Sequence, residues 1–152
     1  MKLSNFPDSP LMGLLLRLLG QKYSQLVSAE LSAAGFDDIG PHHANVFPFI
    51  RDEGIHVGEL AALAGVRKQS MAQTVDELIE AGYLDRRPDP NDKRAKLLFL
   101  TEKGSAVRPI GKTTGQQIEN HWAQLIGKED FVSLKELMIR LLKKLRDEAD
   151  SE

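Results

Sequence analysis

Apolar residues recur at helical spacing along most of the chain, and glycine or proline interrupts the pattern at intervals. Ser9 followed by Pro10 predicts a helix start, and this helix runs to about Ala34, before Gly35. Its apolar residues cover more than one face and include Leu11, Leu14, Leu15 and Leu18. We therefore expect a partner chain to cover the surplus apolar surface.

Three further helices are expected before the middle of the chain. Gly40-Pro41 predicts the start of a helix that ends before Gly54 and is bent by Pro48. A short helix is predicted over residues 57–64, and another over residues 67–81. A glycine follows each of these two helices and can end it.

The pattern then changes to strands and back to helices. Strands are predicted over residues 83–87 and 96–100, joined by a proline-containing turn. Thr101 is expected to cap a long helix that runs to about Ile126 and is kinked at Pro109. A last helix, predicted over residues 128–146, carries a broad apolar stripe that includes Leu134, Met138, Leu141 and Leu145.

This order predicts a mainly α fold with a small β-hairpin wing, in which a winged helix-turn-helix is flanked by dimerisation helices from both ends of the chain. We expect an N-terminal dimerisation helix in residues 1–34, a winged helix-turn-helix domain in residues 40–104 and C-terminal dimerisation helices in residues 105–152. A symmetric homodimer would bury the apolar surplus.

The helix predicted over residues 67–81 has two different faces. At about 100° per residue, one face collects Met71, Ala72, Val75, Leu78 and Ile79, which we expect in the core. The opposite face carries Gln69, Ser70, Gln73 and Glu77, with Arg67 and Lys68 at the N-terminal end. Amides can read base edges, and cations at a helix N-terminus suit phosphates, so this face is a candidate for DNA recognition. A plain amphipathic helix with a polar outer face is the alternative interpretation.

Charge is distributed unevenly. The whole chain has a formal net charge of −2, but residues 86–96 contain five basic side chains against two aspartates, which gives +3 there and −5 elsewhere. A polyanion would therefore dock at the hairpin. The candidate DNA contacts are Arg67, Lys68, Gln69, Ser70, Gln73, Thr74, Arg86, Lys93, Arg94 and Lys96.

One stretch resembles a known family. ELAALAGVRKQSMAQTVDELIEAGYLDRRPDPNDKRAKLLFLTEKG is similar to the winged helix-turn-helix of the MarR family of bacterial transcriptional regulators, above all in the wing DPNDKRAK and the following LTEKG. The resemblance implies that Arg94 is the wing-tip arginine that enters the minor groove and that Asp92 orients it. It also implies a repressor that binds a pseudopalindromic operator as a homodimer and is released by a small ligand, often aromatic or anionic.

The chain departs from the family pattern at four positions in or before this stretch, and one of them is the unusual Pro48. Relatives usually have Ser or Asp where this chain has Arg67, Thr where it has His56, and often Arg where it has Gln73. The operator sequence therefore does not follow from the resemblance.

Other chemistry has weaker support. The chain has no cysteine, which excludes disulfides and thiolate metal sites. His42 and His43 are adjacent, so on a helix their side chains should point about 100° apart, and we expect no metal site. We find no catalytic motif and expect neither an enzyme nor a cofactor. The most apolar stretch, LMGLLLRLLG, is too short to span a membrane, and nothing resembles a signal peptide, so we expect a cytoplasmic protein. A winged-helix metal sensor and a protein-interaction module without its own operator remain as alternatives.

Overall fold

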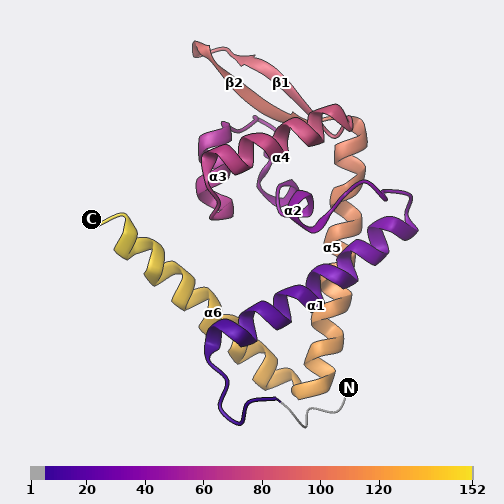
Figure 1. Cartoon of the computed structure of the whole chain (residues 1–152), viewed down its shortest axis with the longest axis vertical. Helices are drawn as coiled ribbons and strands as arrows, with labels where there is room; N and C mark the ends of the chain where they lie inside the picture. Colours follow the sequence, from indigo (N-terminus) through magenta and orange to yellow (C-terminus); the bar gives the residue numbers. More distant parts are fainter. Residues whose placement is uncertain (1–5, 152) are drawn as a thin grey trace. The chain divides into compact units, whose positions relative to one another are not determined.

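The computed structural model describes residues 6–151 and contains six α-helices, one 3₁₀ helix and one β-hairpin within that range (Figure 1). The chain divides into two compact units, one extending to Thr114 and the other beginning at Gly115. The prediction of a mainly α fold with a β-hairpin wing is confirmed. Among the described residues, no helix is both long and apolar enough to cross a membrane.

The first helix begins later than the sequence predicts. Helix α1 spans Met12–Ala33, and Leu11 occupies the N-cap position with an extended backbone. The amides of Leu14 and Leu15 donate to the Leu11 carbonyl oxygen at 3.0 and 3.4 Å, so the helical hydrogen bonds start there. The predicted start at Ser9 is therefore wrong, whereas the predicted end is confirmed by a φ of +91° at Gly35.

The second predicted helix is broken into two short pieces. Helix α2 covers only Pro41–Ala44, and a 3₁₀ helix, η1, covers Phe47–Phe49. Pro48 has no N–H to donate to the Ala44 carbonyl, and its ring would clash with that carbonyl in a continuous helix. The proline therefore interrupts the helix instead of bending it.

The helix-turn-helix is confirmed as predicted. Helix α3 spans Val57–Ala64 and helix α4 spans Lys68–Glu80. Gly65 ends α3 in the left-handed conformation, with a φ of +68°, which reverses the chain at low steric cost.

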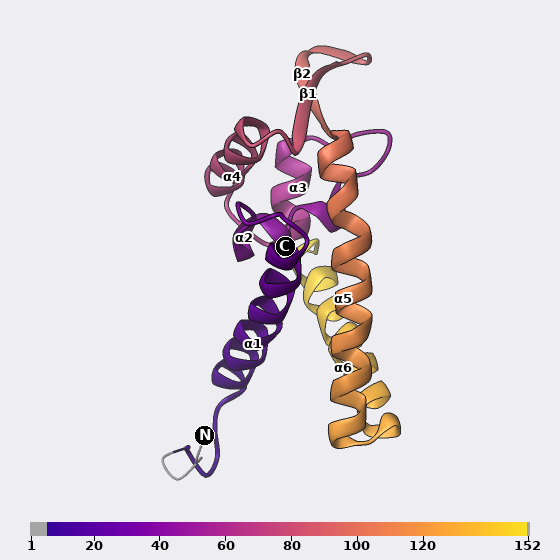
Figure 2. The same ribbon diagram turned by 90° about the vertical axis from the view of Figure 1, so that its right-hand side faces the viewer.

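The wing is longer than predicted. Strand β1, Leu84–Asp89, pairs antiparallel with strand β2, Asp92–Leu100, and only two residues form the turn. Pro88 lies inside β1 opposite Lys96, next to an irregularity in the register, which a strand with a free edge tolerates. The hairpin projects away from α3 and α4, as Figure 2 shows.

Two long helices complete the chain. Helix α5 spans Glu102–Ile126 and helix α6 spans Lys128–Ala149, with Gly127 between them at a φ of +96°. The Gly104 amide donates to the Thr101 hydroxyl at 3.0 Å, so the predicted cap at Thr101 is confirmed.

A single apolar core joins α3, α4 and the base of the wing. Ile55 exchanges two backbone hydrogen bonds with Leu98 of β2, which attaches the wing to the segment before α3. Tyr83, between α4 and β1, is completely buried. The other core residues include Leu31, Ile39, Val46, Phe47, Ile50, Leu60, Met71, Val75, Leu78, Leu84 and Val107. This packing fixes α4 and the wing on one scaffold.

Candidate nucleic-acid interface

Helix α4 presents the polar face that the sequence predicts. Met71, Val75 and Leu78 are buried, and Ala72 and Ile79 are half-buried. The exposed side chains are Arg67, Lys68, Gln69, Ser70 and Gln73. Burial of the apolar set leaves the amides and the hydroxyl in solvent, where a ligand can reach them.

The N-terminus of α4 carries positive charge. Arg67 is the N-cap residue, its side chain makes no cap hydrogen bond, and the first turn contains no acidic residue. The helix dipole and the free amide groups add to the charges of Arg67 and Lys68. This end of α4 therefore suits an anion such as a phosphate group.

Two candidate contacts already have partners within α4. The Thr74 hydroxyl donates to the Ser70 carbonyl oxygen at 3.1 Å, and the Gln73 amide donates to Glu77 at 3.1 Å. Thr74 would have to give up its bond to act as a donor elsewhere. Gln73 is held in one orientation by the carboxylate one turn away.

The basic residues of the wing fall into two groups. Near its base, Arg86 donates to Asp76 of α4 at 2.6 Å, and Arg87 donates to Asp85 at 3.0 Å while its guanidinium lies 4.5 Å from the centre of the Phe99 ring. Farther out, Lys93, Arg94 and Lys96 are exposed. The outer three cations dominate the charge near the tip of the hairpin.

Asp92 contacts Arg94 differently from the expectation. Its carboxylate accepts a hydrogen bond of 2.9 Å from the backbone amide of Arg94, and no ion pair joins the two side chains in the part of the chain that the structure describes. The short side chain of Asp92 reaches the amide two residues on, as in an Asx turn. Asp92 thus shapes the turn and leaves the Arg94 guanidinium in solvent.

Sequence reasoning missed the contacts that hold the wing turn. His56, the N-cap residue of α3, lies with Nε2 3.0 Å from Asp89 Oδ2 and with Nδ1 3.2 Å from the Lys96 carbonyl oxygen. Asp89 is buried and also accepts a 2.8 Å hydrogen bond from the Asn91 amide. The only signal in the sequence was histidine at a position where relatives have a capping threonine.

A second missed cluster lies between α2 and α4. The expectation that His42 and His43 point apart is wrong, because their ring centroids lie 3.8 Å apart. Their Nε2 atoms lie 3.2 and 2.7 Å from the same oxygen of Glu77. Helix α2 has only four residues, so the spacing rule for a long helix does not fix where its side chains end.

Electrostatics in this cluster favour a permanently ionised Glu77. The hydrogen bond from His43, followed by those from His42 and Gln73, lowers the pKa of Glu77 from 4.5 to about 2. Glu77 therefore stays negative at any physiological pH. A negative charge on the exposed side of α4 opposes phosphate but suits a cation.

The residues predicted to mediate dimerisation are mostly exposed. On α6, Leu134, Met138, Leu141 and Leu145 are between 43% and 57% exposed. On the N-terminal side, Leu11 and Leu18 are exposed, whereas Leu14 and Leu15 are half-buried. The leucine stripe of α6, which consists of Leu134, Met138, Leu141 and Leu145, is more exposed than is usual for an apolar stripe on a monomeric protein.

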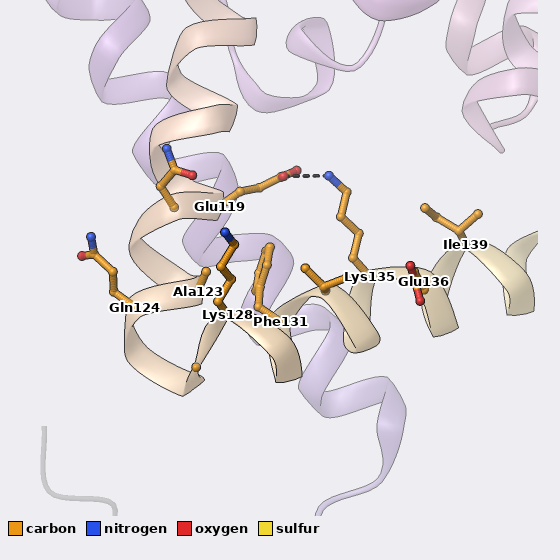
Figure 3. A pocket seen from close by; sticks show the side chains of 11 residues that line it. Glu119, Ala123, Gln124, Lys128, Phe131, Lys135, Glu136 and Ile139 are labelled. Carbon is orange, nitrogen blue, oxygen red and sulfur yellow. Dashed lines mark hydrogen bonds and ion pairs between the residues drawn. The ribbon is translucent and has the colours of Figure 1, made fainter.

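An open cleft of about 850 Å³ lies at the corner between the end of α5 and α6 (Figure 3). Its lining combines Ala123 and Phe131 with charged residues, and Lys135 bridges to Glu119 at 2.7 Å. The residues of α6 that line the cleft include Val132 and Ile139, and these two lie on a different face of the helix from the leucine stripe. This part of the protein has room for apolar side chains from another molecule.

The chain is similar in sequence to several transcriptional regulators. A model of the MarR family matches residues 37–95. The multiple antibiotic resistance protein MarR of Escherichia coli is 27% identical over 133 residues, which are 86% of this chain and 90% of MarR. The exopolysaccharide II synthesis transcriptional activator ExpG of Rhizobium meliloti is 33% identical over 84 residues, 55% of this chain, and this match spans only 43% of ExpG.

Solved structures agree with these matches. The crystal structure of wild-type apo MarR from Escherichia coli has a TM-score of 0.70 at 26% identity and covers 89% of this chain and 99% of that one. A mutant MarR complexed with operator DNA has a TM-score of 0.73 at 27% identity, over 86% and 93% of the two chains. The similarity includes the winged core and most of the flanking helices, and it confirms the predicted resemblance to the MarR family.

Proposed function

We propose that the protein is a sequence-specific DNA-binding transcriptional regulator, a repressor that blocks a promoter, and not an enzyme. The observation that carries this proposal is the exposed amide face of α4 beside a wing segment of net charge +3. A helix with a polar face would not by itself indicate DNA binding, but the adjacent basic hairpin supplies the attraction for phosphates that binding requires. The relative solved with operator DNA supports the same function.

The proposed contacts divide by chemistry. Gln69, Ser70 and Gln73 face base edges in the major groove, where amides can pair with adenine and a hydroxyl can contact a base or a phosphate. Thr74 adds to the same face. Phosphates are contacted by Arg67, Lys68 and Arg86. The adjacent minor groove is contacted by the wing residues Lys93, Arg94 and Lys96.

We propose that the protein acts as a homodimer. The exposed leucines of α6 and the cleft at the corner of α5 and α6 offer apolar surface that a second copy would bury. In this arrangement residues 1–34 and 105–152 form the dimerisation region and residues 40–104 form the DNA-binding region. Two copies of α4 would then read the two halves of a pseudopalindrome about one helical turn apart.

Regulation and location follow from the same proposal. A small aromatic or anionic effector would release the DNA by binding better to one arrangement of the two winged domains than to the other. The protein would act in the cytoplasm, where a bacterial regulator meets its promoter.

Selection of bound sequences from random duplex DNA tests the proposal directly. The expected result is an enriched inverted repeat whose two half-sites are separated by about one helical turn. Enrichment of a single half-site would contradict the homodimer. Binding without any enriched sequence, or no binding at low salt, would favour the alternative of a protein-interaction module.

A further inference from the structure

We propose that His42, His43 and Glu77 form a binding site for one divalent transition cation, such as Zn²⁺, between α2 and α4. These are the side chains in the described part of the chain that combine two imidazoles with a carboxylate at close range. One ligand atom from each residue lies within 4.8 Å of the other two. The site itself does not depend on the proposed function, although its effect on DNA binding does.

The distances suit a small tetrahedral cation. The two Nε2 atoms lie 3.2 and 2.7 Å from one carboxylate oxygen of Glu77. Zinc binds nitrogen and oxygen ligands at about 2.0–2.2 Å, so neighbouring ligand atoms of a tetrahedral site are separated by a little more than 3 Å. Only small side-chain shifts are needed to receive the ion.

The ligand chemistry restricts the choice of ion. Two imidazoles and one carboxylate suit zinc, copper or nickel, whereas magnesium and calcium prefer oxygen ligands alone. The His42 side chain is 60% exposed and that of His43 only 12%, so the site opens to solvent on one side. Water can therefore supply a fourth ligand there.

Gly40 leaves the space that the two rings occupy. A side-chain Cβ at this position would lie 3.2 Å from both Cε1 and Nδ1 of His42 and 3.7 Å from Nδ1 of His43. The backbone amide of Gly40 also donates a 3.0 Å hydrogen bond to His43 Nδ1. Without metal, the proton of His43 is therefore on Nε2 and points at Glu77.

Metal binding changes this proton arrangement. The ion needs the lone pair of Nε2, so the proton of His43 moves to Nδ1 and the Gly40 amide loses its acceptor. Gly40 is only half-buried, which lets water take over that hydrogen bond. The exchange replaces two hydrogen bonds to Glu77 with two metal–nitrogen bonds and keeps the carboxylate negative.

The site is joined to the proposed recognition surface. Glu77 accepts the hydrogen bond from Gln73 with Oε1, while the two histidines contact Oε2. An ion bound to Oε2 would fix Glu77 and, through it, the amide of Gln73. If α4 reads DNA as proposed, the cation should change the preference for bases under Gln73 more than the overall affinity.

Zinc titration of the full chain tests the site, with a chromogenic chelator as competitor. We expect one Zn²⁺ per chain for wild type. Changes in the outer shell of a metal site already cost about 10- to 100-fold in affinity, so His42→Asn and Glu77→Gln should each weaken binding by at least about tenfold. His121→Asn, which changes an exposed histidine of α5, should bind as wild type does.

Two further measurements on the wild-type chain keep the test independent of folding. Zn²⁺ should shift the ring resonances of His42 and His43 in NMR spectra and leave those of His121 unchanged. Co²⁺ should give the visible absorption of a tetrahedral site with nitrogen and oxygen ligands. Absence of zinc binding, equal binding by all variants, or shifts confined to His121 would overturn the proposal.

Discussion

His56 and Asp89 join the start of α3 to the turn of the wing, with Nε2 of the imidazole 3.0 Å from Oδ2 of the carboxylate. The other ring nitrogen lies 3.2 Å from the Lys96 carbonyl oxygen. Both partners are acceptors, so the ring makes both contacts when each nitrogen carries a proton. The wing turn is thereby attached to the helix-turn-helix at a point separate from the core.

Removing this contact should loosen the wing. In His56→Ala, the buried carboxylate of Asp89 keeps only the Asn91 amide as a partner, and we expect a loss of about 1–2 kcal/mol in the free energy of unfolding. Urea unfolding would measure the loss, with His121→Ala as the control. Equal midpoints for the two variants would show that strand pairing alone holds the wing.

The outer cations of the wing should dominate its attraction for DNA. Arg94→Ala is expected to weaken operator binding by about 1–3 kcal/mol and to lower the salt slope by about one. Fluorescence anisotropy at several salt concentrations would give both quantities. Lys112→Ala, which removes an exposed cation of α5, should leave both nearly unchanged. Identical curves for Arg94→Ala and wild type would remove Arg94 from the interface.

Tyr83 and Asp38 should make stability depend on pH at both ends of the scale. The hydrogen bond from the Tyr83 hydroxyl lowers the pKa of Asp38 below 3.8, and burial, together with Asp38, raises the pKa of Tyr83 well above 10. The contribution of Asp38 is present above pH 3.8 and is lost as pH falls through its lowered pKa. The contribution of Tyr83 is present below pH 10 and is lost as pH rises, because the unfolded chain releases the phenolic proton first.

Tyr83→Phe should therefore be less stable than wild type at neutral pH and should show a flatter stability profile below pH 4 and above pH 10. Urea unfolding across the pH range would measure both slopes. Tyr23→Phe is the matched control, since Tyr23 lies on α1 and is 37% exposed. Slopes that match wild type at both ends would mean that the Asp38 contact does not affect folding.

Two glycines of α5 should respond in opposite ways to alanine. A Cβ on Gly104 would lie 2.1 Å from the Tyr83 carbonyl oxygen, whereas a Cβ on Gly111 would have no atom within 4 Å. We expect Gly104→Ala to lower the free energy of unfolding by about 1–3 kcal/mol or more through overpacking. Gly111→Ala should raise it by up to about 1 kcal/mol through helix propensity. Thermal unfolding of the pair would test both signs. A tolerated alanine at residue 104 would show that α5 can shift at its first turn.

The leucine stripe of α6 should control association. Leu141 is 57% exposed, and Leu141→Glu would place a charge in the proposed dimer interface. We expect sedimentation equilibrium to give a dimer for wild type at micromolar concentration and a monomer for the variant. Lys144→Glu is the control, because it changes the charge of an exposed residue on the same helix. A monomeric wild-type mass would contradict the proposed homodimer.

Much of the fold could be predicted because the relevant signals are local. Gly35, Gly65 and Gly82 end helices through positive φ values, and the apolar spacing of α4 identifies its buried face. The break at Pro48 is harder to predict from the sequence, because a proline can either bend or end a helix depending on what the neighbouring segments allow.

The site was predictable only where one element supplies all its residues. The exposed face of α4 follows from helical spacing, but His43 meets Glu77 across 34 positions and His56 meets Asp89 through packing of α3 against the wing. The contact of Asp92 is undecided by the sequence for a different reason. A carboxylate two positions before an arginine can reach either the backbone amide or the guanidinium, and the turn geometry decides between them.

The burial of Tyr83 has a consequence for the choice of DNA sequence. Its backbone amide donates to the Leu78 carbonyl oxygen at 2.8 Å, and its ring fills the junction between α4 and β1. A helix and a hairpin joined in this way keep a constant separation. A duplex that contacts both elements must adjust its groove width and its bend to that separation. Two DNA sequences that share the contacted bases but differ in stiffness should therefore bind with different free energies.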